Sequence, residues 1–100
     1  MPIFHTARFK IYPEAQAKVD QVINEFVAYS KANEPGTLSY ISLQDKDDPT
    51  SYLHIFTFQD EAARELHANS PAVERFTAAL YPETLADVEF SEYTLIASTE

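Results

Sequence analysis

The sequence of 100 residues contains no cysteine and only one glycine, Gly36. The lack of cysteine excludes disulfides, thiolate metal sites and cysteine nucleophiles. A single glycine excludes P-loops and dinucleotide fingerprints, which need several glycines to bring the backbone close to phosphate groups. No serine lies in a GxSxG motif, so the nucleophile elbow of the α/β-hydrolases is also absent. We therefore expect neither a nucleotide cofactor nor a covalent mechanism of these types.

Basic side chains are scarce. Seven Lys and Arg residues oppose 16 Asp and Glu residues, which gives a formal net charge of −9 and a pI near 4.6. Such a surface repels phosphate backbones and anionic lipids, so we expect no nucleic-acid or membrane partner. Long apolar runs and a signal peptide are also absent, and we expect a cytoplasmic protein. The length and the hydrophobic content of 45% predict one folded domain over residues 1–100.

The hydrophobic pattern predicts an alternation of strands and helices. Residues 3–12 alternate with a period of two, with His5 among the aliphatic residues of one face, as in a half-buried strand. An amphipathic helix of about five turns follows Pro13 and ends before Pro35-Gly36. We expect further strands over 37–44, 52–58 and 88–97, a turn over 45–50, and short helices begun by Asp60 and Ser70.

The order β-α-β-β-α-β predicts an α+β, ferredoxin-like fold with a four-stranded antiparallel sheet. Two helices cover only one face of such a sheet, whereas both faces carry large apolar residues. The simplest cover for the second face is another copy of the chain, so we expect a homodimer. The hairpin register stays open, because either Leu43 or Gln44 can pair with Tyr52. A slip of one residue decides whether Tyr40 shares a face with His54 and Phe58.

Acidic and histidine residues offer no clear metal site. The cluster at Asp45, Asp47 and Asp48 resembles a calcium loop, but Pro49 and Phe56 stand at ligand positions, which favours a solvated turn. The spacing of the three histidines matches no local ligand pair, and we expect no metal. A histidine in an apolar pocket can instead act as a general base, because its ordinary pKa lies near neutrality.

Several motifs together carry a resemblance. They are Glu34-Pro35-Gly36-Thr37-Leu38 with Tyr40, the turn that closes on Asp48-Pro49, and Asp60-Glu61-Ala62 followed by His67 and Ser70-Pro71. In these features the chain resembles the antibiotic biosynthesis monooxygenase family. The resemblance implies a dimeric α+β barrel with a pocket between sheet and helices in each subunit. The family includes cofactor-free oxygenases, quinol oxidases, haem-degrading enzymes and isomerases, and the fold does not choose among them.

Two departures from the family pattern narrow the choice among these activities. The haem-degrading branch uses an Asn, a Trp and a His where this chain has Ala7, Phe58 and Thr77, so a haem ligand is missing. Phe58 also replaces a tryptophan that is usual in the wider family, which keeps an aromatic wall but loses an N–H donor. His67 matches the histidine of the family's helix.

The resulting hypothesis is a cofactor-independent monooxygenase or quinol oxidase that acts on a small aromatic phenolic substrate with dioxygen. His67 is the expected base and His5 a second base or an orienting group. Phe58 and Phe76 are expected as pocket walls and Tyr40 as a hydrogen-bond donor. We expect Ala63 and Leu66 to form the buried stripe of the helix, with His67 at its edge.

Two alternatives remain from the sequence. One is an isomerase of a small carbonyl compound, in which the same histidines would move protons. The other is a non-catalytic dimeric binding or stress-associated module. A pocket lined by His5 and His67 would favour catalysis, whereas a collapsed one would favour the module.

Overall fold

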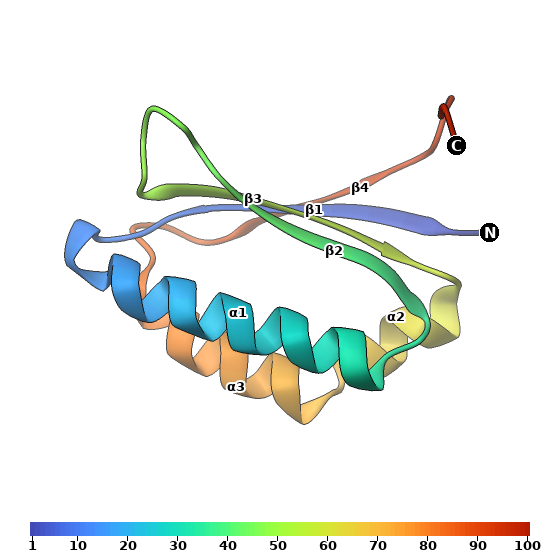
Figure 1. The fold of residues 1–100 in the computed structure, drawn as a ribbon, viewed down its shortest axis with the longest axis horizontal. Coiled ribbons are helices and arrows are strands. Elements are labelled where there is room, and N and C mark those ends of the chain that lie inside the picture. The colour runs from blue at the N-terminus through green and yellow to red at the C-terminus, as the bar shows by residue number, and fades with distance from the viewer.

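The computed structural model describes residues 1–100 and confirms the ferredoxin-like α+β fold. All three helices lie against one face of the antiparallel sheet, whose strand order is β2-β3-β1-β4 (Figure 1). The elements are β1 Ile3–Lys10, a 3-10 turn Pro13–Ala15, α1 Gln16–Asn33, β2 Thr37–Gln44, β3 Ser51–Phe58, α2 Glu61–Ala68, α3 Pro71–Leu80, a second 3-10 turn Tyr81–Glu83 and β4 Glu89–Tyr93. No helix has both the length and the hydrophobicity that are needed to span a membrane.

The helix starts follow the capping residues of the sequence. The side chain of Asp60 accepts a hydrogen bond from the backbone N–H of Ala63 at 2.9 Å, which begins α2. Ser70 accepts one from Val73 at 3.2 Å and begins α3. Both predicted caps are thus confirmed.

The hairpin between β2 and β3 has a definite register. Gln44 pairs with Tyr52, Ser42 with His54 and Tyr40 with Phe56. Paired residues lie on the same face of a sheet, so Tyr40 shares the helix-covered face with His54. Of the two registers that the sequence allowed, the structure has the one that places Tyr40 and His54 on a common face.

The last strand is shorter than the expected 88–97. Tyr93 pairs with Phe4, close to the start of β1, so later residues have almost no strand left to pair with. Residues 94–100 extend beyond the sheet (Figure 1), where Ile96 is 93% exposed. Lack of a partner within the chain therefore ends β4 early.

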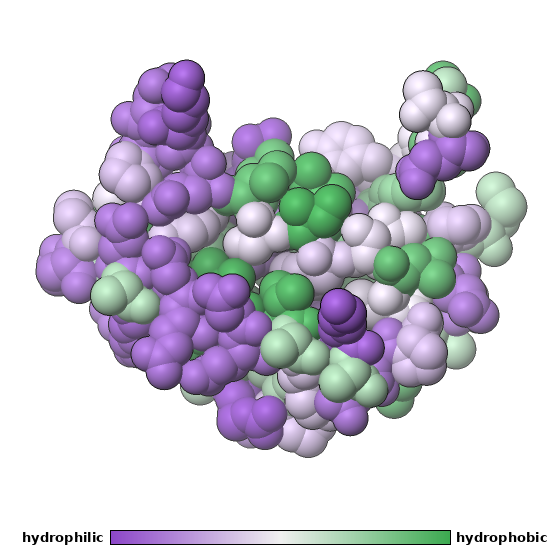
Figure 2. Space-filling view, in the orientation of Figure 1, coloured by the Kyte–Doolittle hydropathy of each residue, from purple (hydrophilic) through white to green (hydrophobic).

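The two faces of the sheet differ in cover. The helix-covered face holds the buried aromatic residues of β1 and β3, whereas Ile41 and Leu43 are almost half exposed. Figure 2 shows hydrophobic side chains gathered at the level of the sheet, with a hydrophilic hairpin turn beside them. One sheet face is thus left with apolar side chains in contact with solvent.

The single glycine allows close packing of α2. A Cβ atom built on Gly36 would lie 2.5 Å from Cβ of Ala63, which is too close for any other residue without a shift. Its φ is not positive, so the need is for space rather than for an unusual conformation. Gly36 therefore lets α2 pack directly on the segment that leads into β2.

The burial of α2 differs from our expectation. Leu66 is 61% exposed, whereas His67 is buried. His67 lies four residues after Ala63 and so on the same side of the helix, the side that packs toward Gly36 and the sheet. The prediction that Leu66 belongs to the buried stripe is wrong, and the histidine takes the inner position.

Candidate active site

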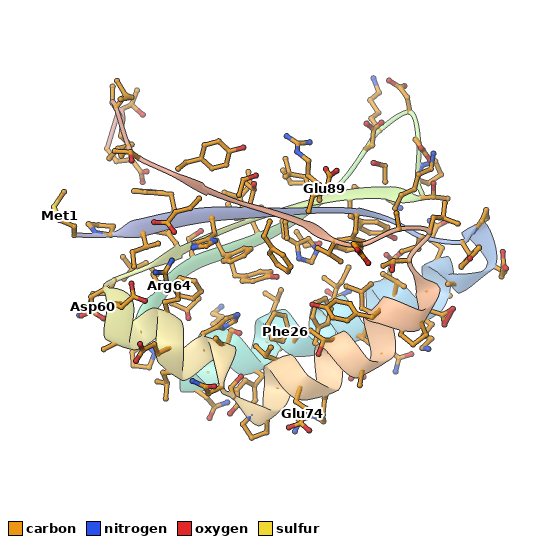
Figure 3. The ribbon with its side chains drawn as sticks, turned by 180° about the vertical axis from the view of Figure 1, so that it is seen from behind. Met1, Phe26, Asp60, Arg64, Glu74 and Glu89 are labelled. Atoms are coloured by element: carbon orange, nitrogen blue, oxygen red, sulfur yellow. The ribbon has the colours of Figure 1, made fainter.

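A cavity of about 280 Å³ lies between the helix-covered face of the sheet and the helices. Thirteen of its 18 lining residues are hydrophobic. Phe26 from α1 stacks on Phe76 from α3 with ring centroids 4.5 Å apart, and Figure 3 shows Phe26 directed toward the sheet. On the opposite wall, Tyr40 stacks on Phe56 at 5.0 Å. These flat walls favour a planar ligand.

The size of the cavity limits the ligand. Cavities for drug-sized ligands span roughly 300–1,000 Å³, and an engineered apolar cavity of about 150 Å³ holds benzene. A volume of about 280 Å³ therefore suits a ligand of one or two rings.

His67 and Glu34 form a buried pair at the α2 end of the cavity. Nδ1 of His67 lies 2.7 Å from Oε1 of Glu34, and the two side chains are 10% and 4% exposed. Thr37 donates its hydroxyl to the same carboxylate oxygen at 2.9 Å. An ionised carboxylate only accepts hydrogen bonds, so Nδ1 donates to it, and in the neutral form of the ring Nε2 keeps a lone pair. Nε2 has no hydrogen-bond partner, and His67 lines the cavity.

His54 is held by two residues of β2. Its Nδ1 lies 2.8 Å from the hydroxyl of Tyr40 and its Nε2 lies 2.9 Å from the hydroxyl of Ser42. Burial lowers the pKa of His54 to about 4, so the ring is neutral at pH 7. Burial also raises the pKa of Tyr40, which keeps its proton. Both rings line the cavity and are uncharged.

His5 lies beside Arg64. Nη1 of Arg64 is 2.9 Å from Nε2 of His5 and 2.9 Å from a carboxylate oxygen of Glu92. Arg64 also contacts both carboxylate oxygens of Glu61, at 2.6 and 2.9 Å. Figure 3 shows Arg64 reaching from α2 toward the sheet. Burial is the main cause that lowers the pKa of His5, so it accepts from the guanidinium in its neutral form.

The charge of Arg64 is compensated at its own site. Two carboxylates, from Glu61 and Glu92, contact the guanidinium. Little positive charge is left for an anionic ligand, and the other lining residues are mostly apolar. No group of three or more His, Asp and Glu side chains is placed to hold a metal ion. The geometry thus favours a neutral aromatic ligand.

Comparison with known proteins agrees with this fold. Residues 2–79 match the sequence model of the family described as antibiotic biosynthesis monooxygenase. The chain belongs to the antibiotic biosynthesis monooxygenase family. No curated protein matches the chain.

Solved structures of the same fold come from several bacteria. A protein of Bacteriodes thetaiotaomicron VPI-5482, provisionally named an antibiotic biosynthesis monooxygenase, is 20% identical with a TM-score of 0.91, over 99% of this chain and 93% of that chain. Rv0793 of Mycobacterium tuberculosis is 17% identical with a TM-score of 0.89, over 100% of both chains. The N63A mutant of SnoaB, a cofactor-independent oxygenase from Streptomyces nogalater, is 21% identical with a TM-score of 0.84, over 98% and 96%.

In this monooxygenase-family chain, the residues singled out from the sequence meet in one place. His67, His5, Tyr40, Phe58 and Phe76 all line the same cavity. Phe58 is 2% exposed and lies 5.0 Å from His67, ring to ring. The cavity is present rather than collapsed.

Several residues that complete the site are not predicted from the sequence. Glu34 was part of the family motif but was not assigned a role, because it lies 33 residues from His67 along the chain. Arg64 carries a local signal, because its position three residues after Glu61 on a helix predicts their ion pair. Ser42 offered no signal, because its partner His54 depended on the unknown hairpin register.

Proposed function

We propose that this chain is a cofactor-independent monooxygenase or quinol oxidase that acts on a small phenolic substrate with dioxygen. The observation that carries the proposal is that Nε2 of His67 has no hydrogen-bond partner, while the residue lines an apolar cavity and its Nδ1 is bound to the buried Glu34. A base so placed takes a phenolic proton at Nε2. The resulting imidazolium lies against a carboxylate, which stabilises it.

The electrons come from the substrate. A phenolate in an apolar cavity lacks the stabilisation of water and reduces dioxygen more readily. For a phenol, attack of reduced dioxygen on the ring and loss of water give a quinone, so phenol and O₂ yield quinone and H₂O. For a quinol, two electrons and two protons pass to O₂ and yield quinone and H₂O₂.

Other residues receive supporting roles. We assign Tyr40 as the donor to the phenolate oxygen, because its proton is retained. His5 is an orienting group rather than a second base, because the lone pair of its Nε2 is engaged by Arg64. Phe58 and Phe76 form walls against the substrate ring. The description of SnoaB as a cofactor-independent oxygenase supports this class of reaction.

We propose further that the protein works as a homodimer that forms an α+β barrel. The face of the sheet away from the helices exposes Ile41 and Leu43, and the segment after β4 exposes Leu95 and Ile96. A second copy would remove this apolar surface from water and bury over roughly 1,200 Å² in total. Light scattering should give twice the chain mass of 11.3 kDa; a stable monomer at micromolar concentration would contradict it.

The reaction is tested with an oxygen electrode. One- and two-ring quinols and naphthols are compared with three-ring anthrones, and products are identified by mass spectrometry. We expect protein-dependent oxygen uptake with the smaller rings and weaker uptake with the anthrones, since the cavity is about 280 Å³. No uptake above the protein-free rate with any ring would overturn the proposed reaction.

A further inference from the structure

Three hydrogen-bonded side chains form a continuous row at the sheet side of the cavity. Ser42 and Tyr40 project from β2 on either side of His54, which pairs with Ser42 across the hairpin. The hydroxyls of Ser42 and Tyr40 lie 2.9 and 2.8 Å from Nε2 and Nδ1 of His54. His54 is 1% exposed, and these are its only side-chain hydrogen bonds.

The position of His54 needs an explanation beyond packing. It lies against Phe9 and Phe76, with ring centroids 5.0 and 6.2 Å away, so apart from the two hydroxyls its neighbours on this side are aromatic. Burying an imidazole costs free energy unless both nitrogens are hydrogen-bonded. His54 is also unsuited as a base, because no carboxylate contacts it and both nitrogens are engaged.

Counting protons leaves two arrangements for the row. A neutral imidazole has one donor and one acceptor nitrogen. In the first arrangement, Tyr40 donates to Nδ1 and Nε2–H donates to Ser42. In the second, Ser42 donates to Nε2 and Nδ1–H donates to the oxygen of Tyr40. Only the second arrangement leaves the proton of Tyr40 free for a ligand in the cavity.

We propose that Ser42 and His54 are positioning residues that turn the hydroxyl proton of Tyr40 into the cavity, toward the oxygen of a bound phenolate. The identity of the ligand rests on the proposed function. In this arrangement all three donors point the same way, and each hydrogen bond polarises the next. The row thus stabilises a negative oxygen through neutral groups.

The inference is tested with 4-nitrophenol, whose phenolate absorbs visible light and whose phenol form does not. The full-length protein is saturated with this probe, and absorbance is followed against pH. In Ser42→Ala, the ionisation constant of the bound probe should fall by about tenfold, because a donor to the charged form is weakened. Tyr40→Phe should reduce it further.

Two variants serve as controls. Ser42→Thr keeps the hydroxyl and should restore the wild-type titration. Ser39→Ala removes a hydroxyl from the same strand at a site with no side-chain hydrogen bond and should leave the titration unchanged.

The outcomes are distinguishable. A wild-type titration in Ser42→Ala, with a shifted one in Tyr40→Phe, would overturn the positioning role of Ser42 and His54. Failure of the wild type to bind 4-nitrophenol would overturn both this inference and the assignment of a phenolate as the ligand. If the titrations follow the expectation but no quinol causes oxygen uptake, the proposed reaction is contradicted and the positioning role of Ser42 and His54 is supported.

Discussion

His67 on α2 and His54 on β3 line the same cavity, and both are buried, yet their hydrogen bonds differ. His67 has a carboxylate, Glu34, on one nitrogen and no partner on the other. His54 has hydroxyl groups on both nitrogens and no charged partner. His67 therefore has the anionic partner that a protonated ring needs, whereas His54 has none.

The difference has a simple physical basis. A protonated imidazole inside an apolar site is stable only beside an opposite charge. Glu34 supplies that charge to His67. At His54 only burial acts, and burial lowers the pKa of His54 to about 4. Burial alone therefore does not identify a histidine as a base. A carboxylate on one ring nitrogen and no partner on the other do.

The largest effect is expected from His67→Ala. Removing a general base typically lowers the rate by about 10²–10⁴-fold, and we expect a loss of at least about tenfold in oxygen-dependent turnover, since water can partly replace the base. Turnover is measured with the oxygen electrode, and circular dichroism and light scattering check the fold and the assembly. Leu66→Ala, at an exposed site on the same helix, is the matched control and should keep the native rate. A folded His67→Ala variant with the native rate would place the base elsewhere.

The neutral histidine predicts how stability depends on pH. His54 binds a proton with a pKa near 6.5 when unfolded and about 4 when folded. Below pH 6.5 the unfolded chain therefore binds more protons at this site, and stability falls as the pH falls. Between about pH 7.5 and about pH 5 the loss due to His54 should be about 2 kcal/mol.

Urea unfolding at both pH values measures this loss. Gln at position 54 cannot titrate, so the loss of stability of the His54→Gln variant between the two pH values should be smaller by about 2 kcal/mol. Equal losses in the two proteins would mean that His54 is not held neutral by burial.

An effect of similar size on stability is expected from Gly36→Ala, which acts on the His67 side of the cavity. The added Cβ would lie 2.5 Å from Cβ of Ala63 and push α2 away from the segment that holds Glu34. We expect a loss of about 1–3 kcal/mol in stability, typical of overpacking, and weaker turnover. Chemical denaturation measures the first quantity. The double variant with Ala63→Gly removes the clashing atom and should recover part of the loss; no recovery would mean that the contact is not the cause.

Much of the fold follows from local patterns. The alternation in β1, the three- and four-residue steps of α1, and the caps at Asp60 and Ser70 each predict a correct element. These patterns depend on neighbours in the sequence, so they are visible without a structure. The family resemblance is confirmed over residues 2–79.

Other features depend on contacts between distant residues. The hairpin register places Ser42 and Tyr40 beside His54, and a shift of one residue would have separated them. The pair of Glu34 and His67 forms only when α2 packs against the segment before β2. The same packing turns His67 inward and Leu66 outward, which helix periodicity alone did not determine.

The state of His67 is the most direct test of the account. In protein labelled with ¹⁵N at histidine, NMR shows which ring nitrogen carries the proton. We predict that in the neutral ring of His67, without ligand, the proton lies on Nδ1 and not on Nε2, and that Glu34→Gln weakens this preference. A neutral ring with its proton on Nε2 in the wild type would contradict the account, because the nitrogen without a hydrogen-bond partner could not then accept a proton from a phenol.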